Sequence, residues 1–264
     1  MNDLAGFASA SLRAAFAADR AALGGWTMLG DPYAAEMIGR AGYDWIGIDM
    51  QHGLISDDRL PDVLRAAAIT GTPALVRVAW NDPTAIMRAL DAGACGVIVP
   101  GINTAAEAAE AVRACRYPPA GERSWGPTRA ALGIPGYSAA AANAATLCFP
   151  MIETKAAFDA LGEIVALPGV DGLFVGPTDL ALSHGETVSP MAPTPEQHER
   201  IAAVADACGS AARVAGIYCG GAAAAGRWLA AGFRLLAIDA DAILLGRALV
   251  AELEAAREAS RDRE

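Results

Sequence analysis

Lysine is almost absent from this chain of 264 residues: among its 20 basic residues, only Lys155 is a lysine. Any chemistry that needs a lysine amine therefore has a single candidate. Charged residues are also scarce, at 19% of the chain, and the 30 acidic residues outnumber the basic ones. The formal net charge of -10 repels phosphate groups. This charge argues against general binding to nucleic acid or to anionic membranes, and it favours a small-molecule partner.

Long hydrophobic runs and closely spaced cysteines are missing as well. No stretch of 18 or more residues lacks glycine, proline and charge together, so no segment is expected to span a membrane. The N-terminal residues lack the basic and apolar regions of a secretory signal peptide. The five cysteines are an odd number and form no Cys-x-x-Cys pair, which is typical of reduced thiols. We therefore expect a cytoplasmic protein without a disulfide framework.

The chain has ample apolar material, at 54% of its residues, and much of it is arranged in eight short runs. These runs are continuously hydrophobic, as expected of parallel strands covered on both faces, and segments with helical periodicity lie between them. The runs span residues 26–30, 45–50, 74–79, 96–100, 147–153, 172–176, 214–219 and 235–239. Eight strands alternating with helices predict an α/β protein with a (β/α)8 TIM barrel fold, with an open doubly wound sheet as the alternative.

No linker divides the sequence, so we expect one barrel domain over residues 1–264, with a charged C-terminal helical tail from about residue 248. Two connections, residues 117–146 and 183–211, exceed the minimal length. Connections of that size are expected to carry function or subunit contacts.

Polar residues end four of the apolar runs, and in a barrel the carboxyl ends of the strands form the active site. His52 follows the second run, Arg77 lies in the third, Glu153 ends the fifth and Asp179 follows the sixth. Each residue alone is typical of a loop or a helix cap, but together they predict a site on one rim. Two carboxylates suit a hard divalent cation, which acts as a Lewis acid on a carbonyl oxygen. Arg77 would add a second positive group, and His52 is the nearby group that exchanges protons near neutral pH.

Four segments in the same order resemble the HpcH/HpaI family of metal-dependent pyruvate aldolases, which cleave 4-hydroxy-2-oxo acids. The resemblance extends from about residue 26 to 247. Its most specific segments are YDWIGIDMQHG (43–53), VRVAWNDPTAIMRALDAGACGVIVP (76–100), EAVRACRYPPAGER (110–123) and MIETKAAFDALGEIVALPGVDGLFVGPTDLALSHG (151–185). Several matched motifs in one order are more specific than any single short motif.

The resemblance implies a role for each candidate residue. Glu153 and Asp179 match the ligands of a divalent cation, with Mg²⁺, Mn²⁺ or Co²⁺ as the candidates. Arg77 matches the residue that holds the keto oxygen and stabilises the pyruvate enolate. His52 matches the general base, which works through a bound water, and Asp91 matches its dyad partner.

The resemblance also implies how the substrate and other subunits are bound. The backbone of Gly176, Pro177, Thr178 and Asp179 would hold the substrate carboxylate, and Trp26 would lie near the site. The small-molecule partners would be an oxo acid and an aldehyde. The family's barrel exchanges its last helix between subunits, which implies a homo-oligomer here, a hexamer or a trimer.

Three departures from the family pattern leave the aldehyde undetermined. Gln51 precedes the histidine where a glutamate is common, and Met151 stands where a glutamine often precedes the metal-binding glutamate. The segment after Arg123 also differs, in the loop expected to shape the aldehyde pocket.

Three other functions remain open at this level. A Schiff-base aldolase would have to use Lys155, which lies two residues beyond Glu153 and more plausibly begins a helix. A lyase acting on a CoA thioester would need a basic surface, which the acidic composition disfavours. The presence of His52, Arg77, Glu153 and Asp179 together argues against a noncatalytic binding barrel.

Overall fold

The strands form a closed barrel of eight parallel strands in chain order in the computed structural model, which describes residues 7–132, 134–187 and 193–261. The barrel predicted from the eight apolar runs is therefore confirmed, and the doubly wound alternative is wrong. The strands are β1 (Ala22–Thr27), β2 (Trp45–Asp49), β3 (Ala74–Arg77), β4 (Gly96–Val99), β5 (Leu147–Ile152), β6 (Gly172–Val175), β7 (Val214–Tyr218) and β8 (Leu235–Ala240).

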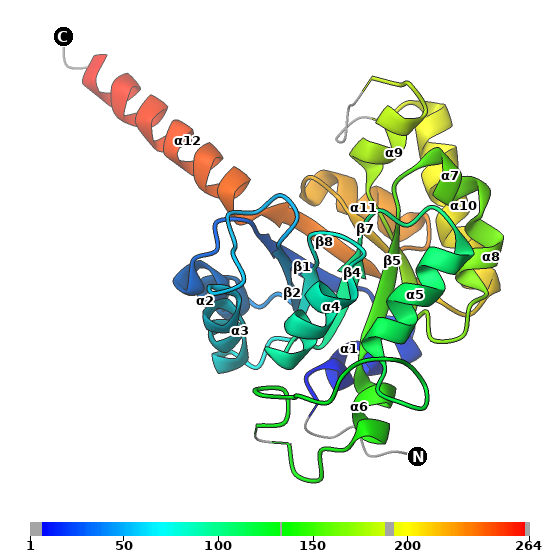
Figure 1. The fold of residues 1–264 in the computed structure, drawn as a ribbon. Helices are drawn as coiled ribbons and strands as arrows, with labels where there is room; N and C mark the ends of the chain where they lie inside the picture. Colours follow the sequence, from blue (N-terminus) through cyan, green and yellow to red (C-terminus); the bar gives the residue numbers. More distant parts are fainter. Residues whose placement is uncertain (1–6, 133, 188–192, 262–264) are drawn as a thin grey trace.

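Helices surround the barrel on its outer side, as Figure 1 shows. Several begin where a side chain accepts hydrogen bonds from the first turn, which satisfies amides that have no partner within the helix. Asp31 and Asp82 act in this way, and Thr104 forms a capping box with Glu107. The helices are α1 (Ser9–Ala17), α2 (Pro32–Arg40), α3 (Leu60–Ile69), α4 (Pro83–Asp91), α5 (Ala105–Cys115), α6 (Ala139–Ala145), α7 (Lys155–Asp159), α8 (Leu161–Val165), α9 (Pro177–Ser183), α10 (Pro195–Ser210), α11 (Ala222–Ala230) and α12 (Asp241–Arg261).

The first strand lies earlier in the chain than the predicted run of residues 26–30, because its two glycines belong to the strand. Gly24 is the register partner of Trp45 on β2, and Trp26 is the partner of Gly47. A methyl group on Gly24 would overlap the indole ring of Trp45, and one on Gly47 would overlap the ring of Trp26. Gly24 and Gly47 therefore each make room for a tryptophan inside the barrel. The sequence did not show this role for Gly24, which lies in a Gly-Gly pair.

The two long connections have different structures. Residues 183–211 consist mainly of α10, which contacts β6 and β7 as an ordinary covering helix. The expectation that this connection carries function or subunit contacts stays a prediction. The described residues of 117–146 contain one short helix, α6, and otherwise follow an irregular path below the barrel in Figure 1.

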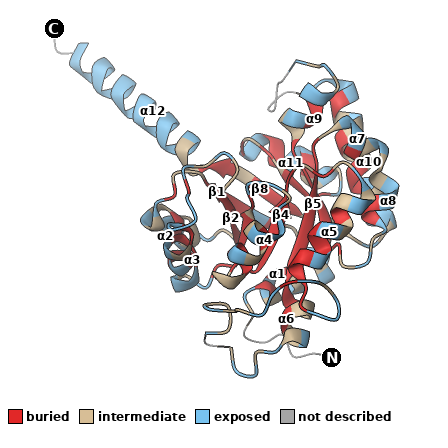
Figure 2. Ribbon diagram, in the orientation of Figure 1, coloured by how far each residue is buried: buried red, intermediate tan, exposed pale blue. Residues whose placement is uncertain are grey.

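The last helix, α12, extends away from the barrel (Figure 1) and exposes almost its whole length (Figure 2). None of its residues is buried, although it carries several large apolar side chains. The exposed apolar residues are Ile243, Leu244, Leu245, Leu249, Val250 and Leu253. The helix begins at Asp241, ahead of the charged tail noted in the sequence. Within the described residues, no helix combines the length and the apolar character needed to cross a membrane.

We expect Gly24→Ala to destabilise the barrel by about 1–3 kcal/mol, because the new methyl group overpacks the indole of Trp45. Gly162→Ala is the matched control, since Gly162 lies on α8 with open space around the site of its missing side chain. Urea unfolding of both variants measures the difference. Equal stability of the two variants would show that the close packing between β1 and β2 is unimportant.

Candidate active site

One cavity of about 280 Å³ lies at the carboxyl ends of the barrel strands. It brings together most of the residues that the sequence singled out: Trp26, His52, Arg77, Gly176, Pro177, Thr178 and Asp179. Glu153 lies directly beside it, because a side chain on Gly176 would come within 3.2 Å of the Glu153 carboxylate. Residues from five different strand ends thus meet at one rim, as the barrel fold requires.

Asp49 organises the polar side of this cavity. It is fully buried and is the register partner of Arg77 on the neighbouring strand. The Arg77 guanidinium donates two hydrogen bonds to its carboxylate, at 2.9 and 2.5 Å, and the Trp26 indole donates a third at 3.2 Å. The backbone amides of Gln51 and His52 donate two more, at 3.0 and 3.2 Å. One carboxylate therefore orients the guanidinium, the indole and the loop that carries the histidine.

The charge of Asp49 is stabilised by these donors. Burial by itself raises the pKa of its carboxyl, but the hydrogen bonds and the charge of Arg77 outweigh burial, and the pKa lies below its ordinary value of 3.8. Arg77 also lies over the Trp26 ring, with 5.3 Å between its Cζ atom and the ring centroid. The guanidinium is thus held on two sides in the cavity.

Glu153 and Asp179 form an acidic pair across the ends of β5 and β6. The Glu153 carboxylate is buried and accepts one hydrogen bond, from the Gly101 amide at 2.7 Å. Burial raises its pKa, and the nearby charge of Asp179 raises it further. A carboxylate whose charge is disfavoured by burial and by a neighbouring carboxylate fits a bound cation, which would relieve both effects.

This oxygen-rich pair fits a divalent cation that takes most of its ligands from water and substrate. No group of three or more His, Cys, Asp or Glu side chains suited to a metal ion occurs in the part of the chain that is described. Mg²⁺ is commonly held by one or two carboxylates, with water and substrate completing its ligands. Glu153 and Asp179 therefore match a site whose remaining ligands come from solvent and substrate.

The start of α9 offers two backbone donors to the cavity. The amide of Gly176 is committed to the sheet, since it donates to the Ile152 carbonyl at 3.3 Å, and Pro177 has no N–H group. The first backbone amide of α9 to form a hydrogen bond to the carbonyl four residues earlier is that of Leu180, which donates to Gly176. This leaves the amides of Thr178 and Asp179 without partners in the helix. Of the predicted anion-binding backbone, only these two amides are available.

The cavity has an aromatic side, of which the sequence predicted Trp26 but not Phe174 or Tyr218. Trp26 stacks on Phe174, with 5.8 Å between ring centroids, and meets the edge of Tyr218 at the same distance. Asp49 was missed as well, although a carboxylate inside the apolar run WIGIDM was an available signal. Phe174 and Tyr218 gave no such signal, because aromatic residues in a buried strand are ordinary core residues.

His52 and Lys155 lie in contrasting places. His52 is an exposed residue that lines the cavity through the loop tied to Asp49. Lys155 begins α7, its side chain is 60% exposed, and it forms an ion pair with Asp159 at 2.6 Å. The lysine is thus a surface helix residue, as the sequence indicated.

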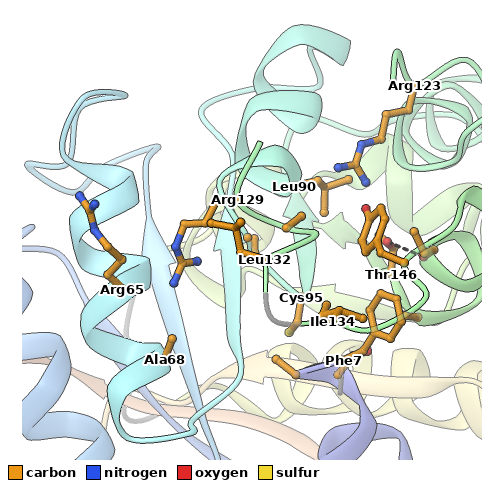
Figure 3. Close-up of a pocket in the computed structure, with 18 residues that line it drawn as sticks. Phe7, Arg65, Ala68, Leu90, Cys95, Arg123, Arg129, Leu132, Ile134 and Thr146 are labelled. Carbon is orange, nitrogen blue, oxygen red and sulfur yellow. Dashed lines mark hydrogen bonds between the residues drawn. The ribbon is translucent and has the colours of Figure 1, made fainter. Parts of the chain in front are cut away.

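Asp91 does not lie beside His52 in this chain. It ends α4, where the helix leads back to the start of β4, and its carboxylate accepts a hydrogen bond from the buried Arg123 at 2.6 Å. Figure 3 shows Arg123 at a larger cavity, of about 460 Å³, lined also by Cys95 and Thr146 just before β4 and β5. Because α4 runs from the carboxyl end to the amino end of the barrel, the predicted dyad contact is not made within one chain.

The chain was compared with known proteins at the levels of sequence and structure. The sequence profile described as HpcH/HpaI aldolase/citrate lyase matches residues 23–245. The chain belongs to this family. A hydroxypyruvate/pyruvate aldolase of Rhizorhabdus wittichii is 39% identical over 231 residues, which cover 87% of this chain and 91% of that protein. A 4-hydroxy-2-oxo-heptane-1,7-dioate aldolase of Shigella sonnei is 37% identical over 251 residues, or 94% of each chain.

A solved structure extends the similarity to three dimensions. An HpcH/HpaI aldolase/citrate lyase family protein from Burkholderia cenocepacia superposes with a TM-score of 0.86 at 37% identity. The match covers 94% of this chain and 99% of that one. Membership in the HpcH/HpaI family, with its aldolases, makes the chain a carbon–carbon lyase.

Two departures from the family pattern have structural consequences here. Met151 lies in the wall of the cavity, so an apolar thioether occupies a place where a polar side chain would bind substrate or solvent. Gln51 buries its side-chain oxygen, which has no hydrogen-bond partner within the described residues. Met151 thus makes the cavity wall less polar, and Gln51 leaves an uncharged side chain beside His52.

We expect Asp49→Asn to destabilise the protein by about 3–5 kcal/mol at pH 7, because the buried end of Arg77 loses its counter-charge. The pKa of Asp49 is lowered in the folded state, so its stabilising effect is present above about pH 3.8 and is lost as the pH falls through the folded pKa. The difference from the wild type should therefore shrink in acid. Urea unfolding at pH 7 and near pH 3 measures it.

Asp159→Asn is the control for this prediction, since it breaks the exposed pair with Lys155 and should cost at most about 1 kcal/mol. A loss in Asp49→Asn that is as small as in the control would contradict the organising role of Asp49.

Proposed function

We propose that this protein is a divalent-metal-dependent aldolase that reversibly cleaves a 4-hydroxy-2-oxo acid into pyruvate, or hydroxypyruvate, and an aldehyde. The observation that supports it most strongly is the Arg77 guanidinium, held by Asp49 beside the Glu153–Asp179 pair on one cavity. Fixed positive charge next to an acidic pair is the arrangement needed to hold an oxo acid and the enolate formed from it.

Glu153 and Asp179 would hold the cation, with Mg²⁺, Mn²⁺ and Co²⁺ as candidates. When bound, such a cation supplies Lewis-acid polarisation of the substrate's keto oxygen. Arg77 donates hydrogen bonds to the same oxygen, and its planar fork is kept in orientation by Asp49. The amides of Thr178 and Asp179 bind the substrate carboxylate.

His52 accepts the proton of the 4-hydroxyl group, through a water molecule. As that proton leaves, the C3–C4 bond breaks, the new aldehyde departs, and the bonding electrons pass into the enolate of pyruvate. Arg77 stabilises the negative charge that develops on the enolate oxygen, and this stabilisation is greatest when the bond is breaking. Protonation at C3 then releases pyruvate. The same groups in reverse order add pyruvate to an aldehyde.

A CoA-thioester lyase is the second function that the family name allows. Such an enzyme needs cationic groups around the mouth of the site to bind the nucleotide phosphates. The cavity has one arginine, which is already paired with Asp49, and the chain as a whole is acidic. These features favour the small oxo acid.

We also propose that the working protein is a homo-oligomer, a hexamer or trimer, in which α12 packs against another subunit. The helix contributes no residue to the core of its own chain, and six large apolar side chains on it are exposed. Covering them with a second copy of this chain would remove an apolar surface that single chains rarely expose.

We expect Glu153→Gln and Asp179→Asn to abolish metal-dependent cleavage, because each removes a carboxylate ligand. The assay uses pyruvate and hydroxypyruvate with a panel of aldehydes, in both directions, with added Mg²⁺, Mn²⁺ or Co²⁺. EDTA should stop turnover in the wild type. Lys155→Ala is the matched control and should keep most activity. Borohydride trapping of pyruvate on Lys155, with activity in EDTA, would overturn the metal assignment.

His52→Ala should lower turnover by roughly a factor of 10² to 10⁴, the usual contribution of a general base. His198→Ala is the control, since His198 lies on α10 against Trp228 and away from the cavity. Steady-state cleavage rates compare the two. Unchanged turnover in His52→Ala would mean that another group accepts the proton.

A further inference from the structure

The cavity has two chemically different sides. Arg77 and Asp179 form the charged side, which His52 also lines. Trp26, Phe174 and Tyr218 form the aromatic side. If the proposed function holds, the carboxylate and keto oxygen of the oxo acid lie against the charged side. The carbons derived from the aldehyde then face the aromatic side, where Tyr218 supplies a hydroxyl group.

A buried aspartate fixes that hydroxyl. Tyr218 is the register partner of Ala237, and Asp239 lies two residues further along β8, on the same face of the sheet. The Tyr218 hydroxyl donates to the Asp239 carboxylate at 3.3 Å. Asp239 is only 2% exposed, so its carboxylate depends on protein donors.

The other contacts of Asp239 keep it an acceptor. The Ala240 amide donates to it at 2.9 Å, and Arg247 on α12 forms an ion pair with it. Burial raises the pKa of Tyr218, so its phenol keeps its proton at neutral pH. The proton of Tyr218 therefore points to Asp239, and a lone pair of the phenolic oxygen remains to accept a hydrogen bond from the cavity.

We propose that Tyr218, oriented by Asp239, makes this aldolase select neutral hydroxyaldehydes as the aldehyde partner. A hydroxyl on the aldehyde donates to the phenolic oxygen, which an alkyl group cannot do. A carboxylate on the aldehyde has no proton to donate, so it would bring two acceptor oxygens together and could not form this hydrogen bond. The site thus recognises the hydroxyl group because that group can donate a hydrogen bond to the Tyr218 oxygen.

Asp239 and Arg247 are positioning residues in this account, and they connect the cavity to the C-terminal helix. The first turn of α12 is tied to the same rim by Asp241, which accepts hydrogen bonds from the Thr27 hydroxyl at 2.7 Å and the Met28 amide at 2.8 Å. Met28 also lines the cavity. The start of α12 therefore supports both Tyr218 and Met28.

The test compares glycolaldehyde with propanal as acceptors for pyruvate, since the two aldehydes have the same number of heavy atoms and differ in the hydroxyl. The ratio of their kcat/KM values is independent of the fraction of active enzyme. We expect the wild type to favour glycolaldehyde, and glyoxylate to be a poor acceptor. Tyr218→Phe should lower the ratio by about three- to tenfold, the usual effect of one hydrogen bond.

Variants of the supporting residues test the orientation. Asp239→Asn and Arg247→Met should lower the ratio, Arg247→Lys should retain most of it, and Asp239→Asn should have no further effect in the Tyr218→Phe background. Tyr33→Phe is the matched control, since Tyr33 is exposed on α2. An unchanged ratio in Tyr218→Phe, or equal effects of Asp239→Asn with and without the Tyr218 hydroxyl, would overturn the proposal. If Asp239→Asn does not fold, the kcat/KM ratios of Tyr218→Phe and Arg247→Lys test the proposal.

Exchange of the pyruvate methyl protons with deuterium oxide separates this proposal from the proposed function. Exchange needs only the charged side and no aldehyde, so in the wild type it tests the proposed function separately from the choice of aldehyde. A wild type that shows no metal-dependent exchange would contradict the aldolase itself. A wild type that exchanges and turns over, with a ratio insensitive to Tyr218, would contradict only the selection of hydroxyaldehydes.

Discussion

The rest of the site depends on the hydrogen bonds that the Asp49 carboxylate accepts. It is buried at the end of β2 and accepts hydrogen bonds from the guanidinium of Arg77, the indole of Trp26 and the amides of Gln51 and His52. A buried charge is costly unless donors surround it, and these donors belong to the groups to which we assign the proposed chemistry. The barrel supplies the geometry, because β2 and β3 bring Asp49 and Arg77 into register. Stability and function therefore rest on the same interactions.

The cavity around Asp49 has two sides with different chemical properties. The acidic pair and Arg77 suit the oxo acid, whose negative charge must be held more tightly as a bond breaks. The aromatic side carries a single oriented hydroxyl, on Tyr218, and is supported by the start of α12. The scarcity of lysine is consistent with this division, since the one lysine lies on the surface and the cationic group in the cavity is an arginine.

The sequence predicted the barrel and most residues of the cavity, because continuous apolar runs and polar strand ends are local signals. It placed β1 too late, since the pair Gly24–Gly25 resembles a turn until Trp45 is seen to pack against it. It missed Asp49 and Tyr218, whose roles depend on partners on other strands. It also assigned Asp91 to His52, although the end of α4 lies at the other end of the barrel. Sequence patterns show which residues end a strand, whereas only the register shows which of them meet.

The central claim is that Glu153 and Asp179 hold a divalent cation at the place where Arg77 meets the oxo acid. Electron paramagnetic resonance of Mn²⁺, titrated into the protein with and without pyruvate, tests it most directly. We predict about one Mn²⁺ site per chain, a spectrum that changes when pyruvate is added, and loss of both features in Asp179→Asn. A wild type that binds no Mn²⁺, or a spectrum that pyruvate leaves unchanged, would contradict the account.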